Sequence, residues 1–259
     1  MLHKVFPLVK PAPLSEIVQS RDAFIYMDRG MRAAGWMYPK NEHWHRIYRL
    51  WTLTTLICGL CFVPMAFFGS YFMDLNSFTP AQFINSVQVG LNSCGSVFKV
   101  TFILLGIWRF EQANILLDRL DKRCISDDQR AKVHQTVANC NMVYMYFQIL
   151  YVLYIISTFL GAVLQGEMAW KFYNPLVNWR ESSAKFWTSA FIELFMMSCC
   201  VFMQQLADSY PIVYMLIIRG HIITLKMRIT QLRSDLELSE PQNYAELMKC
   251  IDDHRLIIM

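Results

Sequence analysis

Positive charge is distributed unevenly along this chain, and that distribution constrains the fold more than any other feature. Four long apolar stretches, at about residues 47–72, 81–107, 141–164 and 186–218, divide the sequence into five polar pieces. From the N-terminus, these pieces contain seven, zero, six, three and six Lys and Arg residues. Because short positively charged loops resist translocation, we expect the first, third and fifth pieces in the cytoplasm. The pattern predicts a multi-span membrane protein with a cytoplasmic N-terminus.

Each apolar stretch supplies the roughly 20 residues that a helix needs to cross about 30 Å of hydrocarbon. Hydrophobic residues make up 55% of the chain and charged residues 17%, which favours a membrane protein over a soluble domain. A soluble protein with long buried helices is the alternative, but it does not explain the alternation of Lys and Arg. We therefore predict an all-α, polytopic membrane helical bundle with four transmembrane helices. The net charge of +4 is spread over several pieces and mixed with acids, so it does not indicate nucleic acid.

Hydropathy divides the chain into three regions: a cytoplasmic tail at 1–46, a four-helix transmembrane region at 47–218 and a cytoplasmic amphipathic segment at 219–259. Apolar residues recur at helical spacing within the tail: Phe24, Met27, Met31 and Ala34. This spacing fits a short helix lying in the inner membrane interface, and it fits equally a helix packed on the protein surface.

The last region looks incomplete. Apolar residues at steps of three and four form a narrow seam there: Ile222, Leu225, Ile229, Leu232 and Leu236. A second amphipathic segment begins at Tyr244 and ends near Ile258. Seams of this kind require partner helices, and the remaining sequence supplies none. We therefore expect this chain to be part of a longer protein or a truncated product.

The second apolar stretch carries an unusual polar stripe. Its residues recur at steps of three and four, on one helix face: Asn85, Gln88, Asn92, Ser96 and Lys99. Lipid would penalise such a face, so we expect it to point into the bundle or a water-filled cavity. Hydrogen bonding between helices and the lining of a cavity explain the stripe equally well.

Three charged residues and several aromatic ones stand out in the predicted helices and outer loop. Lys99 and Asp208 lie at similar depths near the inner side, and we expect them to pair or to share one polar network. Glu193 lies about two turns into the fourth helix from the outer side, where we expect a water-exposed position. The outer loop at 165–185 is rich in aromatic residues, which indicates either an interfacial belt or a lid over a pocket.

No enzyme motif is present in the sequence. The chain has no GxSxG, Walker-type loop or HExxH, and no two CxxC motifs at zinc spacing. The His residues are not accompanied by acids or Cys at the spacing of metal ligands. We therefore expect neither catalysis nor a cofactor or metal.

Several dispersed segments resemble the insect odorant receptors, particularly fruit-fly-type members. They are Lys10–Leu14, Phe78–Pro80, Ile115–Arg123, Tyr173–Pro175, Asn178–Arg180 and His221–Arg233. Each segment is weak alone, but their order on a matching topology is more specific. The resemblance implies a ligand-gated cation channel of seven helices with the N-terminus inside. It also implies a shared co-receptor as a partner and the plasma membrane of a sensory dendrite as the location. Four of the seven helices are present here, without the pore-lining last helix, so a chain of this length is not expected to conduct.

The resemblance implies that odorants bind in the outer half of the bundle, and depth and helix face point to the same region. Small volatile ligands gain affinity mainly by burying apolar area in a concave site with few polar groups. The candidate ligand-binding residues are Val89, Asn92, Ser93, Tyr154, Ser157, Thr158, Phe191 and Phe195. Two other classes remain open: a gustatory receptor fragment, and a complete four-helix membrane adaptor without channel activity.

Overall fold

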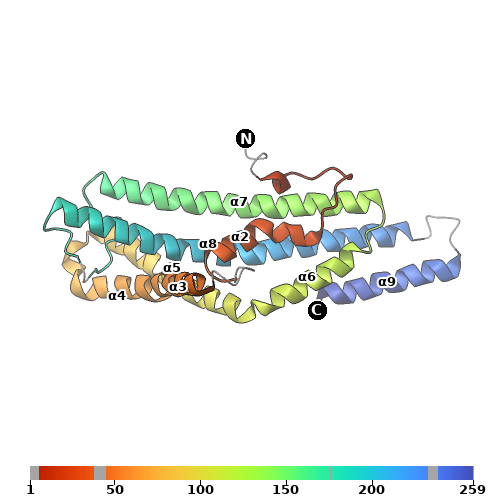
Figure 1. The fold of residues 1–259 in the computed structure, drawn as a ribbon, viewed down its shortest axis with the longest axis horizontal. Coiled ribbons are helices and arrows are strands. Elements are labelled where there is room, and N and C mark those ends of the chain that lie inside the picture. The colour runs from red at the N-terminus through yellow and green to blue at the C-terminus, as the bar shows by residue number, and fades with distance from the viewer. Residues whose placement is uncertain (1–5, 38–44, 175–176, 233–238, 259) are drawn as a thin grey trace. The chain divides into compact units, whose positions relative to one another are not determined.

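Long helices make up nearly all of the computed structural model, which describes residues 6–37, 45–174, 177–232 and 239–258 (Figure 1). Within these residues there is no β-strand, which confirms the all-α prediction. In chain order the elements are η1 (Pro7–Val9), η2 (Ser20–Phe24), α2 (Ile25–Ala33), α3 (His45–Leu56), η4 (Ile57–Phe62), α4 (Val63–Met73), η5 (Leu75–Ser77), α5 (Pro80–Gly106), α6 (Trp108–Asp121), α7 (Asp127–Val163), α8 (Ser183–Gln231) and α9 (Glu240–Ile258).

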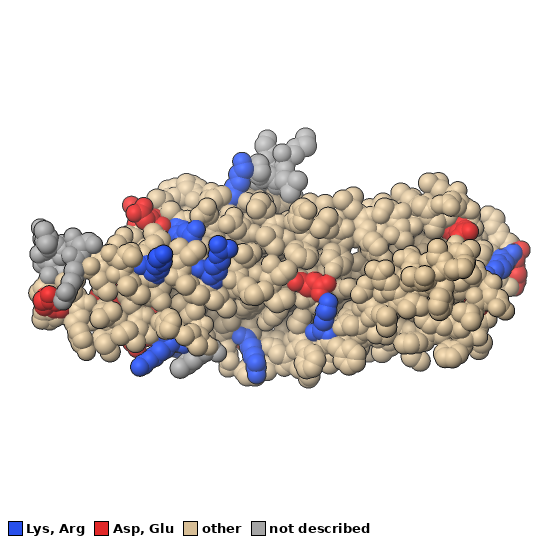
Figure 2. Space-filling view, turned by 180° about the vertical axis from the view of Figure 1, so that it is seen from behind, with Lys and Arg blue, Asp and Glu red and all other residues tan. Residues whose placement is uncertain are grey.

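Four helical segments are long and apolar enough to cross a membrane: His45–Met73, Pro80–Gly106, Asp127–Val163 and Ser183–Gln231. They cover the four predicted apolar stretches to within one residue, so the number of candidate spans is confirmed. The last two helices extend well beyond those stretches, because the flanking polar residues continue the same helix. Figure 2 shows one face on which a broad area carries no Lys, Arg, Asp or Glu side chain, as a lipid-facing surface requires.

The first span contains a π-helical turn, η4, directly before the start of α4. Pro64 lies in the first turn of α4, and its missing N–H and its ring disturb the preceding backbone ladder. Gly59 in this turn approaches α8 closely, since a Cβ there would lie 3.1 Å from the Met203 sulfur. The first span therefore packs closely on α8 at this turn.

The described chain forms two compact units. Unit 1 comprises residues 1–27, 106–145 and 209–259, and unit 2 comprises residues 28–105 and 146–208. In unit 1, the Phe24 ring packs on Phe110 of α6 and Tyr214 of α8, with ring centroids 5.7 and 4.7 Å apart. The Asn141 amide donates to the Asp22 carbonyl at 2.9 Å. The N-terminal segment is thus part of the helical core of unit 1.

The apolar face of the tail helix is buried inside the protein. Phe24, Met27, Met31 and Ala34 are each at most 2% exposed. In unit 2, the Thr55 hydroxyl donates to the Ala34 carbonyl at 2.9 Å. This burial favours the packed helix over the membrane-interface helix, because an interfacial helix would leave this face to lipid.

Two residues of the apolar seam after the fourth span are exposed, as expected of a seam without partner helices. Ile222 and Ile229 are 50% and 47% exposed, and Leu236 lies outside the described residues. The buried face of this part of α8 carries one seam residue, Leu225, together with His221, Thr224 and Arg228. Arg228 pairs with Asp253 at 2.5 Å and also with Glu246, both from α9. Polar partners, rather than the apolar repeat, decide which face of α8 is covered.

The core of unit 2 includes part of the outer loop between α7 and α8. Trp170 and Phe172 are only 5% and 7% exposed, and they pack with Val63 and Phe67 of α4 and Met197 of α8. The Tyr173 N–H donates to the Ala66 carbonyl at 3.0 Å. These aromatic residues therefore act as a lid packed into unit 2, and not as an interfacial belt.

Candidate ligand-binding site

Glu193 of α8 holds the lid in place. Its carboxylate accepts the backbone N–H groups of Ala169 at 3.0 Å, Trp170 at 3.3 Å and Phe172 at 3.4 Å. Glu193 is only 2% exposed, so the expectation of a water-exposed position is wrong. A buried carboxylate needs hydrogen-bond donors, and consecutive backbone N–H groups of a loop supply them.

Unit 2 contains a cavity of about 330 Å³, here called the central cavity, between α5, α7 and α8. Helix α5 contributes Asn85, Gln88, Val89, Asn92 and Ser93 to its wall. Three members of the predicted polar stripe therefore line a cavity. The most buried face of α5 lies beside them and consists of small side chains and one valine: Ser86, Gly90, Ser93, Ser96 and Val100. Small residues allow neighbouring helices to approach closely.

Four of the eight predicted ligand-binding residues line the central cavity: Val89, Asn92, Ser93 and Tyr154. Thr158 lines a neighbouring outer cavity of about 270 Å³, whose wall includes Val89 and the lid residues Met168–Lys171. Phe195 lines a third cavity of about 560 Å³ between α3, α7 and α8, here called the lateral cavity. The structure thus distributes six of the predicted residues over three cavities.

The two other predicted residues lie elsewhere. The Ser157 hydroxyl donates to the Tyr154 carbonyl at 3.1 Å on an exposed part of α7. Phe191 is 58% exposed, and its ring lies 6.0 Å from that of Trp187. Neither lines a cavity found among the described residues.

Sequence reasoning missed the contribution of α8 to the central cavity. Met197, Val201 and Gln204 line it, at steps of four and three residues. This helical spacing was visible in the sequence, but the helix is apolar on all sides, so hydropathy alone did not select one face. On α7, Tyr151 also lines the cavity, one turn before Tyr154.

Tyr151 connects the central cavity to the intramembrane charges. Its hydroxyl donates to Asp208 Oδ2 at 2.6 Å, and Lys99 Nζ donates to Asp208 Oδ1 at 2.7 Å. Both Asp208 oxygens therefore have a donor, as a carboxylate within a membrane span requires. The network fixes the Tyr151 ring in the cavity wall.

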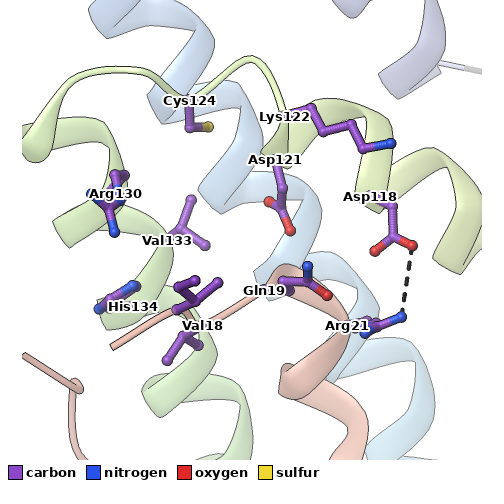
Figure 3. Close-up of a pocket in the computed structure, with 11 residues that line it drawn as sticks. Val18, Gln19, Arg21, Asp118, Asp121, Lys122, Cys124, Arg130, Val133 and His134 are labelled. Atoms are coloured by element: carbon purple, nitrogen blue, oxygen red, sulfur yellow. Dashed lines mark ion pairs between the residues drawn. The ribbon is translucent and has the colours of Figure 1, made fainter. Parts of the chain in front are cut away.

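Unit 1 contains a different kind of cavity, of about 250 Å³, between the N-terminal segment, α6 and α7 (Figure 3). Arg21 pairs with Asp118 across it at 3.8 Å, and Arg130 donates to the Leu14 carbonyl at 3.2 Å. Burial raises the pKa of the Cys124 thiol to about 11, so this Cys is not a reactive thiolate. The charged lining is poorly suited to an apolar volatile ligand.

The described residues contain no group of three or more His, Cys, Asp and Glu side chains placed to hold a metal ion.

Comparison with known proteins identifies the family. The family model described as 7tm Odorant receptor matches residues 79–259. The chain belongs to the odorant receptor family. This membership confirms the resemblance found in the sequence, and it favours neither a gustatory receptor nor a membrane adaptor. Odorant receptors are not enzymes as a family, and with four candidate spans this odorant receptor chain is a multi-pass membrane protein.

Three relatives from Drosophila melanogaster illustrate the similarity. Odorant receptor 42b is 42% identical over 98% of this chain and 64% of its own length, and Odorant receptor 59b is 39% identical over the same shares. Odorant receptor 22a is 38% identical over all of this chain and 64% of its own length. This odorant receptor chain thus spans 64% of the length of these relatives. No solved structure matches it.

Proposed function

We propose that this chain is an odorant receptor subunit that binds small volatile molecules in the central cavity. The family match to residues 79–259 carries the proposal, since it covers all of α5, α7 and α8, which form that cavity. A volume of about 330 Å³ lies within the range of small-molecule sites, roughly 300–1,000 Å³. Apolar side chains such as Val89 and Met197 supply burial, and the carboxamides of Asn85, Gln88 and Asn92 supply hydrogen bonds that select among ligands.

Gating belongs to the same proposal. In a receptor of the length of the matched relatives, assembled with a co-receptor in the plasma membrane of a sensory neuron, the bound odorant opens a cation channel. An odorant that binds the open state more tightly than the closed state shifts the population toward the open one, by no more than its differential affinity. Tyr151 lies in the cavity wall and donates a hydrogen bond to Asp208, which pairs with Lys99. A ligand that contacts Tyr151 therefore contacts a residue bonded directly to this charged pair.

The test is a cavity-filling substitution with a matched control on the neighbouring helix. Ser93→Phe places a bulky ring in the central cavity, while Ser157→Phe adds the same ring at an exposed position that lines no described cavity. We expect Ser93→Phe to weaken binding of a volatile panel by roughly tenfold or more, and Ser157→Phe to leave it unchanged. Binding is measured by tryptophan fluorescence on the chain in phosphatidylcholine nanodiscs.

A second readout addresses gating. The same substitutions in a receptor of full family length, co-expressed with the co-receptor, are tested by current recording against the same panel. Unchanged binding and odour tuning in Ser93→Phe, Asn92→Ala and Tyr154→Ala would remove the central cavity as the odorant site.

A further inference from the structure

The lateral cavity of unit 2 opens at the outer surface of the helices that line it. Its volume is about 560 Å³, and its wall is almost entirely apolar, with no charged residue among its lining. Four of the lining side chains are between 40% and 49% exposed: Trp51, Val152, Ile156 and Phe195. They lie on three candidate membrane spans, and exposed apolar faces of such spans contact lipid. Within the described residues, a molecule dissolved in the bilayer therefore has access to this cavity.

One polar side chain in the lateral cavity has no partner among the described residues. Gln205 of α8 lines the cavity and is 0% exposed, and neither its carboxamide oxygen nor its nitrogen has a hydrogen bond. Two other polar groups of the lining already have hydrogen bonds: Trp51 Nε1 donates to the Ala33 carbonyl, and the Thr55 hydroxyl donates to the Ala34 carbonyl. Gln148 and Ser198 also line the cavity, and neither is hydrogen-bonded to Gln205. Buried polar groups in proteins are hydrogen-bonded as a rule, so the Gln205 carboxamide is the group in this cavity that a ligand's polar atom would satisfy.

The shape and chemistry of the cavity select the class of ligand. A single hydroxyl group satisfies both atoms of a carboxamide, because it accepts from Nε2 and donates to Oε1. From Gln205 the lining continues along α8 to Leu194, eleven residues or roughly 16 Å away. The site thus fits an elongated apolar molecule with one hydroxyl at its end. A phospholipid headgroup, which is charged, finds no charged residue in the lining.

We propose that the lateral cavity binds a membrane sterol, with its hydroxyl on the Gln205 carboxamide and its apolar rings along α8 toward Leu194. On the orientation that the Lys and Arg distribution predicts, Asp208 lies near the inner boundary, so Gln205 places the hydroxyl just below the inner headgroups. This site adjoins the central cavity, since Tyr151 and Val201 line both, but the sterol proposal does not rest on the proposed odorant site.

The probe is a photoactivatable cholesterol with a diazirine on its ring system and a free hydroxyl, added to the chain in phosphatidylcholine vesicles. We expect saturable crosslinks, mapped by mass spectrometry, to peptides at 152–156 and 194–202. Unlabelled cholesterol should compete, and cholesteryl methyl ether, whose hydroxyl is blocked, should compete roughly tenfold less, as one lost hydrogen bond predicts.

Two neighbouring glutamines provide the matched comparison. Gln205→Leu removes the carboxamide and should make cholesterol and its methyl ether equal competitors, while Gln204→Leu, in the wall of the central cavity, should keep the preference. Gln205→Leu should retain the thermal stability of the parent chain, because an unpaired buried amide contributes no hydrogen bond. Ser198→Phe fills the lateral cavity and should reduce labelling.

Three results would overturn the proposal. The first is labelling that does not saturate and is uniform over all lipid-exposed helix faces. The second is equal competition by the two sterols in the parent chain. The third is displacement of the probe by a volatile alcohol such as 1-dodecanol but not by cholesterol, which would assign the cavity to volatile ligands.

Discussion

Lys99 and Asp208 are 109 residues apart in the sequence, and their charged groups meet at 2.7 Å. Lys99 comes from α5 and Asp208 from α8, within two candidate membrane spans. An ionised side chain within a membrane span is costly unless it has a partner of opposite charge. Lys99 and Asp208 each supply that partner to the other. The pair also holds the Tyr151 hydroxyl, which lies in the wall of the central cavity.

Charge reversal tests this pair. Lys99→Asp and Asp208→Lys each leave two like charges facing one another, and both should lower the yield of folded protein and its melting temperature. The double variant restores opposite charges and should recover part of the loss, with a coupling energy of about 0.5–3 kcal/mol in a double-mutant cycle. Additive losses would show that the two residues do not stabilise one another. Surface expression and thermal unfolding in detergent are the measurements.

Removal of the Glu193 carboxylate should release the lid. Glu193→Ala leaves the buried N–H groups of Ala169, Trp170 and Phe172 without their acceptor. Each such loss costs about 1–3 kcal/mol, so amide hydrogen exchange in the loop should accelerate at least about tenfold. Glu181→Ala, an exposed acid of the same loop, is the control. Exchange measured by mass spectrometry that is unchanged at 168–173 would contradict the role of Glu193.

Gly220 marks a close approach between α8 and α7 in unit 1. A Cβ at this position would lie 2.5 Å from Thr136 Cγ2, so Gly220→Ala should destabilise the chain by about 1–3 kcal/mol. Adding Thr136→Ala removes the two nearest atoms, Cγ2 and Oγ1, and should restore part of the stability. The matched control is Gly161→Ala in α7, which meets nothing within 4 Å and should be neutral or stabilising by up to about 1 kcal/mol. Thermal unfolding distinguishes the three variants.

Asp121 should give unit 1 a pH dependence. Burial raises the pKa of its carboxyl above the ordinary 3.8, although hydrogen bonds from Ser20 act in the opposite direction. The folded chain therefore binds more protons than the unfolded chain, and stability falls as pH rises from 3.8 through the folded pKa. The slope from this one group is at most about 1.4 kcal/mol per pH unit.

Asp121→Asn isolates that dependence. The melting temperature of the variant, relative to the parent chain, should increase as the pH rises from 3.8 through the folded pKa of Asp121. Asp128→Asn, at an exposed position of α7, removes one negative charge without removing a buried group, and should give no comparable trend. A constant difference between the parent chain and Asp121→Asn across this range would show that Asp121 does not titrate with folding.

The sequence predicted the elements well because their signals are local. Twenty or more apolar residues define a span without reference to the rest of the chain, and all four spans follow that rule. The proximity of Lys99 and Asp208 was also predictable, since both are costly at similar depths and each needs a partner. The stripe on α5 indicated a polar face by its spacing alone, and three of its residues line the central cavity.

Other features depend on groups that are distant in the sequence. Nothing local shows that three backbone N–H groups of the outer loop meet Glu193, so its burial was not predicted. The buried face of α8 after Arg219 follows from Asp253 and Ser20, which approach it from α9 and the N-terminal segment. The apolar repeat in this part of the sequence could not show that polar groups from α9 and the N-terminal segment cover this face of α8.

By itself, the sequence determined the helical class, the four spans and the family, because hydropathy, charge asymmetry and segment order are properties of the chain in one dimension. Only the tertiary structure decided which predicted residues share the central cavity, that the aromatic loop is a lid, and that Gln205 lies unpaired in the lateral cavity. These features are relations between side chains on different helices. They are fixed by how helix faces pack against one another, and an apolar helix does not encode that choice in its own periodicity.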